Sequence, residues 1–236
     1  MNWDLKRFNV SRIILAICAC VFATSTGFAD VTVTSTDLDP DTAIPDDGPG
    51  TAGITSIVNI MEDEIIEDVC VHINGLEHTS LGDLTAEIRY LGGPNGGPSA
   101  YVPLFDRVGV EGTGLPGDKS NLFGNYTFTS NFLEDPDTSF WSEAADTPED
   151  VVVNAGNDYF ASDDTGAFFD IGAFFAGQST AGQWEFRMRD LNDLGNEIGN
   201  VDSFTLELKT SVVPEPASAA LLCLGGLALA VRRRRA

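Results

Sequence analysis

The stretch Leu84-Thr85-Ala86-Glu87-Ile88-Arg89-Tyr90 decides the fold of this 236-residue chain. Its apolar residues stand at the even-numbered positions, and threonine, glutamate and arginine stand at the odd-numbered ones. Successive side chains of a β-strand point to opposite faces. This period of two therefore predicts a strand with one buried face and one face in water.

The same alternation recurs near the end of the chain, in residues 184–189 and 204–209. Two shorter apolar runs, residues 57–60 and 69–73, also have the pattern of strands. Strands with one apolar and one charged face are typical of antiparallel sheets that water covers on one side. The pattern therefore favours antiparallel sheets.

The segments between these runs carry turn-forming residues. Residues 92–98 and 109–117 are rich in glycine, and residues 134–137 and 146–150 are acidic. The body shows almost no helical periodicity, whereas a parallel α/β sheet would need a crossover helix between its strands. We predict an all-β fold, an antiparallel β-sandwich of jelly-roll or Greek-key type, with an N-terminal signal helix and a C-terminal transmembrane helix at its ends.

The N-terminus has the order of a secretory signal peptide. Three basic residues precede the apolar residues 13–22, which are followed by small residues and Gly27-Phe28-Ala29. This order predicts cleavage after Ala29. A retained N-terminal anchor is the alternative, although the apolar run is short for a bilayer core, which needs about 20 helical residues.

The C-terminus begins with Val213-Pro214-Glu215-Pro216, continues with the apolar residues 217–231 and ends in an arginine cluster. The cluster consists of Arg232, Arg233, Arg234 and Arg235. The two prolines predict an extended, accessible spacer, because each fixes φ and lacks an N–H. Arginine clusters stay on the cytoplasmic side of a membrane, so the body is expected to lie outside. A plain C-terminal anchor and a hydrophobic helix docked on the fold are the alternatives.

The order of Pro214, Glu215 and Pro216, a short span and an arginine cluster resembles the PEP-CTERM sorting signal of bacterial exported proteins. The resemblance implies an exosortase-type transpeptidase as partner, which cuts near Pro-Glu-Pro while the chain is transiently anchored in the inner membrane. It also implies that the body is passed to the cell envelope or the extracellular space.

The body, residues 30–212, is strongly acidic. It holds six of the 13 Lys and Arg residues and 34 of the 36 Asp and Glu residues, so its net charge is about −28. Such a field repels nucleic acid, which excludes DNA or RNA as a partner, and it keeps an exported protein soluble. Cys70 is the one cysteine of the body, so the body forms no internal disulfide.

Several stretches resemble, in order, the P domain, also called Homo B, which follows the catalytic domain in subtilisin-like proprotein convertases. They are residues 44–48, 67–73, 78–84, 104–106, 174–177 and 182–186, together with Asp190. The resemblance spans residues 44–208 and implies a β-sandwich, with Phe204 where the family usually has tryptophan. The chain thus divides into a signal peptide (1–29), an N-terminal segment of the body (30–43), a P/Homo B-like β-sandwich (44–212) and a PEP-CTERM signal with a membrane span (213–236).

A hydrolase of the subtilisin type needs Ser, His and Asp around an oxyanion hole. The chain has two histidines, His72 and His78, and no Gly-Thr-Ser nucleophile motif. We therefore expect no enzyme activity and no catalytic residues, and we expect a serine endopeptidase label to be wrong for this chain. His78 is expected to hydrogen-bond the backbone of a His-Thr turn that Asp83 ties down, and His72 is expected to face solvent or the opposite sheet edge.

Calcium is the cofactor that this composition suggests. The best local oxygen ligands are Asp190, Asn192 and Asp193, in a turn that also contains a glycine, although the twelve-residue spacing of an EF-hand is missing. The pairs at 46–47 and 163–164 are weaker candidates. The alternative is that these acidic turns are simply solvated.

Four aromatic residues, Tyr101, Tyr126, Trp141 and Trp184, suggest a surface on which a sugar could stack. Trp184 is in phase with the apolar face of its strand and is expected in the core, which leaves Trp141 as the better surface candidate.

The most economical interpretation is an exported, non-enzymatic β-sandwich protein, sorted to the cell envelope or the extracellular matrix, with a structural or adhesive role. The alternatives are a carbohydrate-binding module, with exopolysaccharide as ligand, and an accessory domain to a separately encoded protease.

Overall fold

The computed structural model describes residues 29–34, 42–45, 53–93, 96–110, 117–130, 139–192 and 199–211. They all belong to one unit, Ala29–Ser211. The predicted signal helix, the C-terminal span and the sorting residues Pro214–Pro216 and Arg232–Arg235 lie outside the described residues. Within the ranges given, no helix is long and apolar enough to cross a membrane.

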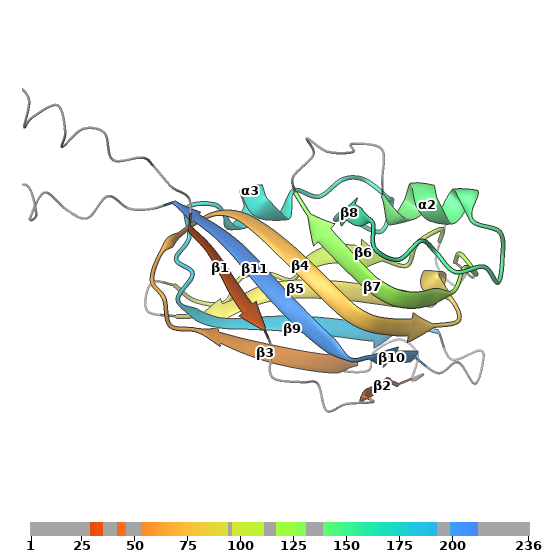
Figure 1. Ribbon diagram of the computed structural model, residues 1–236, viewed down its shortest axis with the longest axis horizontal. Coiled ribbons are helices and arrows are strands. Elements are labelled where there is room, and N and C mark those ends of the chain that lie inside the picture. Colours follow the sequence, from red (N-terminus) through yellow and green to blue (C-terminus); the bar gives the residue numbers. More distant parts are fainter. Residues whose placement is uncertain are drawn as a thin grey trace, which may run out of the picture. The chain divides into compact units, whose positions relative to one another are not determined.

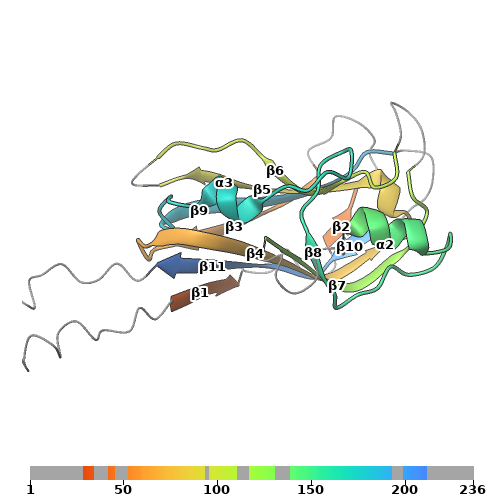
Figure 2. The same ribbon diagram turned by 90° about the horizontal axis from the view of Figure 1, so that it is seen from above.

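The described strands form two sheets. The larger sheet consists of β1 (Ala29–Thr34), β2 (Thr42–Ile44), β4 (Ile65–His78), β7 (Leu122–Thr129), β8 (Asp158–Phe160), β10 (Gly199–Val201) and β11 (Ser203–Ser211). The smaller sheet consists of β3 (Ile54–Ile60), β5 (Leu84–Gly92), β6 (Val102–Asp106) and β9 (Gly182–Asp190). Figure 2 shows the two sheets as two layers, which is the sandwich that the sequence predicts.

The long strand β4 organises the larger sheet (Figure 1). One edge of β4 pairs with β11 and, near its end, with β10; the other edge pairs with β7. The smaller sheet has the order β3-β9-β5-β6. These pairs are antiparallel, as expected, whereas β7 and β8 run parallel. A purely antiparallel sandwich is therefore wrong at this edge.

The predicted strands are confirmed, and each is longer than expected, β4 by the most. Residues 57–60 belong to β3, which begins at Ile54, and residues 69–73 belong to the 14-residue β4. The prediction stopped at Asn74-Gly75 because the alternation breaks there. The strand continues through a bulge, in which Gly75 adopts a φ of 60° that is strained for residues with a side chain.

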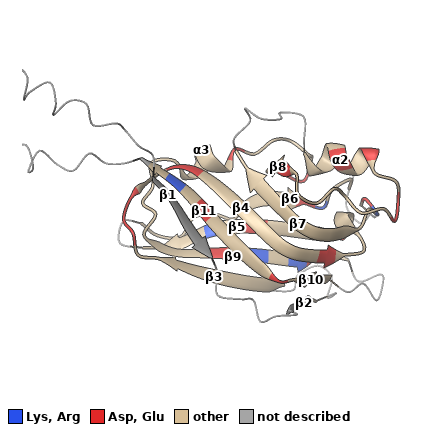
Figure 3. Cartoon of the chain, viewed as in Figure 1, with Lys and Arg blue, Asp and Glu red and all other residues tan. Residues whose placement is uncertain are grey.

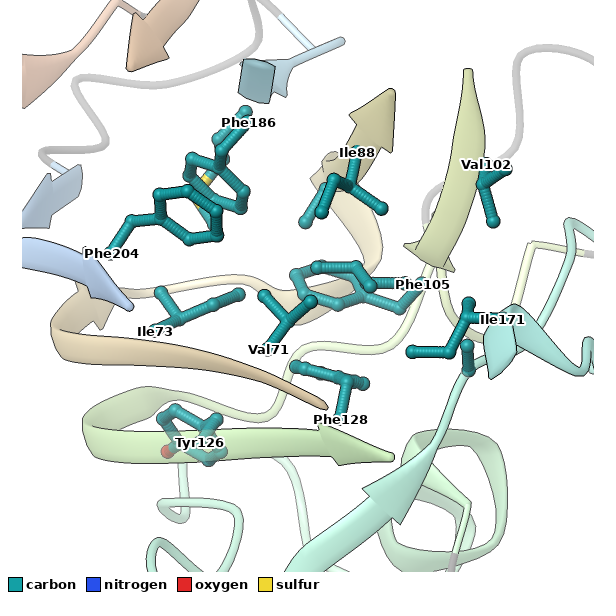
Figure 4. Close-up of a cluster of buried hydrophobic side chains, with 14 of the residues drawn as sticks. Val71, Ile73, Ile88, Val102, Phe105, Tyr126, Phe128, Ile171, Phe186 and Phe204 are labelled. Atoms are coloured by element: carbon teal, nitrogen blue, oxygen red, sulfur yellow. The ribbon is translucent and has the colours of Figure 1, made fainter. Parts of the chain in front are cut away.

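The core lies between the sheets, where their apolar faces meet (Figure 4). Val71 and Ile73 of β4 and Phe204 of β11 face inward and are fully buried. Phe204 stacks on Phe186 of β9, with ring centroids 4.8 Å apart and planes inclined by 15°. This pair joins the two sheets directly, so period-two patterning on both strands gives one continuous core.

Short helical segments interrupt the all-β pattern. They are η1 (Leu81–Asp83), α2 (Phe140–Asp146) and α3 (Ile171–Phe175). Ser139 caps α2 by accepting from the N–H of Ser142, and Phe140 then enters the core against Tyr159, with centroids 4.5 Å apart. Such helices are too short to show helical periodicity, which is why the sequence did not predict them.

Candidate functional site

His78 is buried at the end of β4, and its side chain is fully shielded from solvent. Its Nδ1 lies 2.8 Å from the carbonyl oxygen of Ser80 and 3.1 Å from the N–H of Ser80, which can donate to it, and this confirms the predicted bond between the ring and the backbone of its turn. Its Nε2 lies 3.1 Å from Oδ2 of Asp190, at the end of β9. A carboxylate only accepts, so Nε2 carries the proton of this bond. Because the partners are 112 residues apart, no local sequence signal indicated it.

Asp190 and Asn192 close this turn instead of presenting free ligands. Oδ1 of Asp190 accepts from the N–H of Asn192 at 3.0 Å, and Oδ2 accepts from His78. The side-chain amide of Asn192 donates to Oδ1 of Asp83 at 3.1 Å, so the Asp83 carboxylate holds the segment after β9, whereas the prediction assigned it to the His-Thr turn. Both carboxylate oxygens of Asp190 are therefore used by protein donors.

The calcium prediction has no further support in the described part of the chain. There, no group of three or more His, Cys, Asp or Glu side chains is arranged to hold a metal ion. Asp163 accepts from the N–H groups of Thr165 and Ala167, and the hydroxyl of Thr165 lowers the pKa of its carboxyl. Asp193 and the pair 46–47 lie outside the described residues, so calcium binding stays a prediction.

A second histidine cluster lies on the outer face of the larger sheet. Nδ1 of His72 lies 3.0 Å from the hydroxyl of Thr127, and Nε2 lies 3.6 Å from Sγ of Cys70 and 3.6 Å from a carboxylate oxygen of Glu207. This arrangement has the composition of a Cys-His nucleophile pair. However, burial, and then the negative charge of Glu207, raise the pKa of Cys70 to about 12. Cys70 is thus a thiol at neutral pH, whereas a nucleophilic cysteine must be a thiolate.

This raised pKa gives a test in solution. At pH 8 the mature, exported protein is expected to react with iodoacetamide at Cys70 about a thousandfold more slowly than a cysteine with the ordinary pKa of 9.0, since the thiolate fraction falls tenfold per unit. The rate should rise about tenfold per pH unit between pH 7 and 10. The same protein unfolded in urea serves as the control and should react at the ordinary rate. Fast alkylation of the folded protein at pH 7 would show an activated nucleophile.

Neither histidine has the surroundings of a catalytic triad. The serine hydroxyl nearest in sequence to His78, that of Ser80, donates to the carbonyl of Asp118, and His78 has no exposed surface with which to meet a substrate. The ring nitrogens of His72 contact Thr127, Cys70 and Glu207. Around these two histidines, the described residues offer no nucleophile–base pair that is both accessible and ionised for acyl transfer.

The proposed sugar-stacking surface is wrong as a group of four. Tyr126 and Trp184 are fully buried, which confirms Trp184 as a core residue. Trp141 lies in α2, not in a loop, and is partly buried against the core. Tyr101 lies under the guanidinium groups of Arg89 and Arg187, whose Cζ atoms are 4.2 and 3.5 Å from its ring centroid. The four rings thus do not share one exposed face.

The outer face of the smaller sheet carries a ladder of ion pairs that sequence reasoning missed. Arg187 and Arg189 donate to Glu87, and Arg89 pairs with Glu185 at 2.5 Å. These arginines are three of the six cations of the body, and Figure 3 shows basic positions on β9. The sequence signal that could have predicted this ladder is the alternation of charged residues within 85–89 and 185–189. The ladder holds three arginines and two glutamates, and each arginine is paired with one of these glutamates.

Both ends of the described unit lie at the same end of the larger sheet. Ala29, where we expect signal cleavage, pairs with Thr210, and Ser211 pairs with Ile65 (Figure 1). A hollow of about 330 Å³ is lined there by Ile65, Tyr90, Gly96, Gly97, Gly177, Gln178 and Ser179. The hydroxyl of Tyr90 donates to the carbonyl of Ala181, and burial raises the pKa of this Tyr90 hydroxyl. The described lining thus contains no pair of groups suited to acid–base catalysis.

The solved structures that resemble the chain have low similarity to it. The Aeromonas sobria serine protease in complex with the chaperone ORF2 is 14% identical, with a TM-score of 0.41, and the alignment covers 84% of this chain and 29% of that one. A structure of the A. sobria serine protease is 14% identical, with a TM-score of 0.41, and the alignment covers 78% of this chain and 27% of that one. A structure of infectious bursal disease virus, Gt strain, is 15% identical, with a TM-score of 0.37, and the alignment covers 81% of this chain and 34% of that one. The chain thus spans about a third or less of their lengths.

The sequence comparisons concern the end of the chain. The whole chain has no significant match among curated proteins. Residues 212–235 match the model of the PEP-CTERM protein-sorting motif. This motif is the recognition signal for exosortase-type processing. The chain therefore ends in a PEP-CTERM motif, which implies export and sorting through a membrane-anchored C-terminal signal.

Proposed function

We propose that this chain is an exported, non-enzymatic β-sandwich protein with a structural or adhesive role in the cell envelope or the extracellular matrix. An exosortase-type transpeptidase would cut it near Pro214-Glu215-Pro216 and release the body from the inner membrane. The observation that carries the proposal is the match of residues 212–235 to the PEP-CTERM motif, directly after β11 ends at Ser211. The P/Homo B-like character of residues 44–212 is part of this proposal.

The arrangement of the ends supports processing at both of them. β1 begins at Ala29 and pairs antiparallel with the end of β11, so the two predicted cleavage points adjoin neighbouring strands at one end of the sheet. The core and the hydrogen bonds of the sandwich belong to residues 29–211. Cleavage after Ala29 removes the first residue of β1, which pairs with Thr210, but the loss of the leader and the tail takes no described core residue from the body.

The absence of activity is supported by the chemistry of the body. The buried His78 serves a turn, and the raised pKa of Cys70 keeps its thiol protonated. The net charge of about −28 keeps such a body soluble outside the membrane and repels anionic lipid. The carbohydrate-binding and protease-accessory alternatives stay predictions from the sequence.

The sorting residues can be tested in cells that export the protein. Replacing Pro214, Glu215 and Pro216 by alanine should block cleavage, so that the full tail, including Arg232–Arg235, stays on a protein held in the inner membrane. The unaltered protein should be found in the envelope or the medium without its final arginines. Mass spectrometry of both ends, together with cell fractionation, measures this.

The chain offers a matched control for this experiment. Pro148-Glu149 is an exposed Pro-Glu pair in the body, so its replacement by alanine should leave sorting unchanged. Normal processing of the Pro214–Pro216 variant, or a wild-type protein that retains its arginines in the cytosol, would contradict the proposal.

A further inference from the structure

The edge strand β3 has an unusual sequence for its position. It is the terminal strand of the smaller sheet and pairs with β9 over all seven residues, Ile54–Ile60, without a register shift. In the part of the chain that the structure describes, no strand pairs with its other edge. A terminal strand presents unpaired N–H and C=O groups, which can template pairing with another strand.

Exposed sheet edges are normally protected by charges, proline, bulges or short length. The opposite edge of the same sheet, β6, contains Pro103 and Asp106 and pairs through a bulge. In the larger sheet, the outlying strands β2 and β8 have three residues each, and the terminal strand β1 carries a charge at Asp30. β3 contains no charge, no proline and no bulge. It is therefore the described edge that is best suited to accept another strand.

The side chains of β3 also favour an apolar contact. Ile54, Val58 and Ile60 are buried in the core, while Ile57, at the centre of the strand, is 47% exposed. In a body with a charge of about −28, two copies repel each other over most of their surface. The uncharged edge of β3 is a place where two copies can approach closely.

Charge also selects the direction of pairing. β3 is followed by Glu62-Asp63-Glu64. Parallel pairing of two copies would place these acidic runs against each other, whereas antiparallel pairing moves them to opposite ends. An antiparallel register centred on Ile57 places this residue opposite its own copy and Thr55 opposite Asn59. Both faces of such a pair would then be free of like charges.

We propose that β3 is the contact between two copies of this chain, paired antiparallel through Ile57 into one continuous eight-stranded sheet. Main-chain hydrogen bonds would supply the affinity, as in other cases of strand addition. Because the contact is the same patch on both copies, it closes on itself and gives a two-fold dimer instead of an open fibre.

The direction of β3 determines where the C-terminal ends of the two copies point in this dimer. Ile60 pairs with Gly182, and Glu64 and Thr180 exchange hydrogen bonds beside Ile65, which pairs with Ser211. β3 therefore ends at the end of the sandwich where β11 ends (Figure 1). In the antiparallel dimer the two C-terminal ends point in opposite directions. The pair would join copies held on two facing surfaces, a consequence that rests on the proposed adhesive role.

Complementary charges test the dimer and its register. The mature, exported wild-type protein should be dimeric by analytical ultracentrifugation at about 10 µM, a concentration at which a contact of micromolar Kd is occupied. Ile57→Lys and Ile57→Glu should each raise the Kd at least tenfold, because like charges then lie directly opposite each other. An equimolar mixture of the two variants should restore the dimer as a mixed pair. Phe123→Lys, at a 62% exposed position of β7, is the matched control and should leave the dimer intact.

Cell aggregation separates this inference from the proposed function. Cells exporting either Ile57 variant alone should not clump, whereas a mixture of the two cell populations should. A monomeric wild-type protein, a dimer that survives Ile57→Lys, or a mixture that fails to pair would overturn the β3 contact. Dimers in solution without aggregation of the mixed cells would leave β3 pairing intact and contradict the facing-surface geometry, and with it the adhesive role.

Discussion

Asp190→Ala is expected to lower the free energy of unfolding by about 2–4 kcal/mol, because its carboxylate accepts from two donors and a buried donor left without its acceptor costs about 1–3 kcal/mol. Asp190 is 1% exposed, and the side chain of His78, its partner at 3.1 Å, has no exposed surface. Without the carboxylate, Nε2 of His78 and the N–H of Asn192 both lose their acceptor in the interior. Urea denaturation of the mature protein, followed by circular dichroism, measures the loss.

Two variants make this prediction sharp. Asp164→Ala removes an exposed acidic residue and should change the free energy of unfolding by no more than about 0.5 kcal/mol. His78→Phe combined with Asp190→Leu should recover part of the loss, because it removes the unpaired Nε2 donor, although the N–H groups of Asn192 and Ser80 still lack their acceptors. Equal effects of Asp190→Ala and Asp164→Ala would show that the buried pair contributes nothing to stability.

The strands were predictable wherever apolar and polar residues alternate within a single strand. Residues 84–90, 184–189 and 204–209 alternate because each strand has a core face, and this requirement is local. Partners distant in sequence were not predictable in this way. His78 and Asp190 meet because β4 and β9 end at the same place, which only the topology determines. The tail was recognised because its three elements are contiguous in the sequence.

The aromatic residues that were wrongly predicted at the surface show the same limit of sequence-based prediction. Trp141 lies in an acidic stretch, which suggested a surface, and Tyr126 was grouped with it as another aromatic residue. The structure instead places Tyr126 in a cluster with Phe140 and Tyr159, with ring centroids 5.3 and 6.4 Å away. Ser139 makes this possible, since its cap starts α2 and turns Phe140 into the core. A serine three residues before another serine is too common a pattern to reveal this before the structure is known.

Phe204→Ala is the other change with a large expected effect, a loss of about 3–5 kcal/mol, as for other fully buried phenylalanines. Its ring stacks on Phe186 across the two sheets, so the alanine leaves a cavity in the layer that joins β11 to β9. The melting temperature of the mature protein should fall by about 10 °C. Thermal unfolding followed by circular dichroism measures this.

Phe204→Trp tests whether the space at this position is shaped for phenylalanine. The resemblance to the P domain would place tryptophan here, yet the ring planes of Phe186 and Phe204 are only 15° apart and both rings are fully buried. A larger ring must displace Phe186 or its neighbours, so we expect a loss of about 1–3 kcal/mol. Phe123→Ala, at an exposed position, is the control and should cost less than about 0.5 kcal/mol. A Phe204→Trp variant more stable than the wild type would mean that the two sheets can separate to accept the larger ring, and that their spacing is not fixed by this stacked pair.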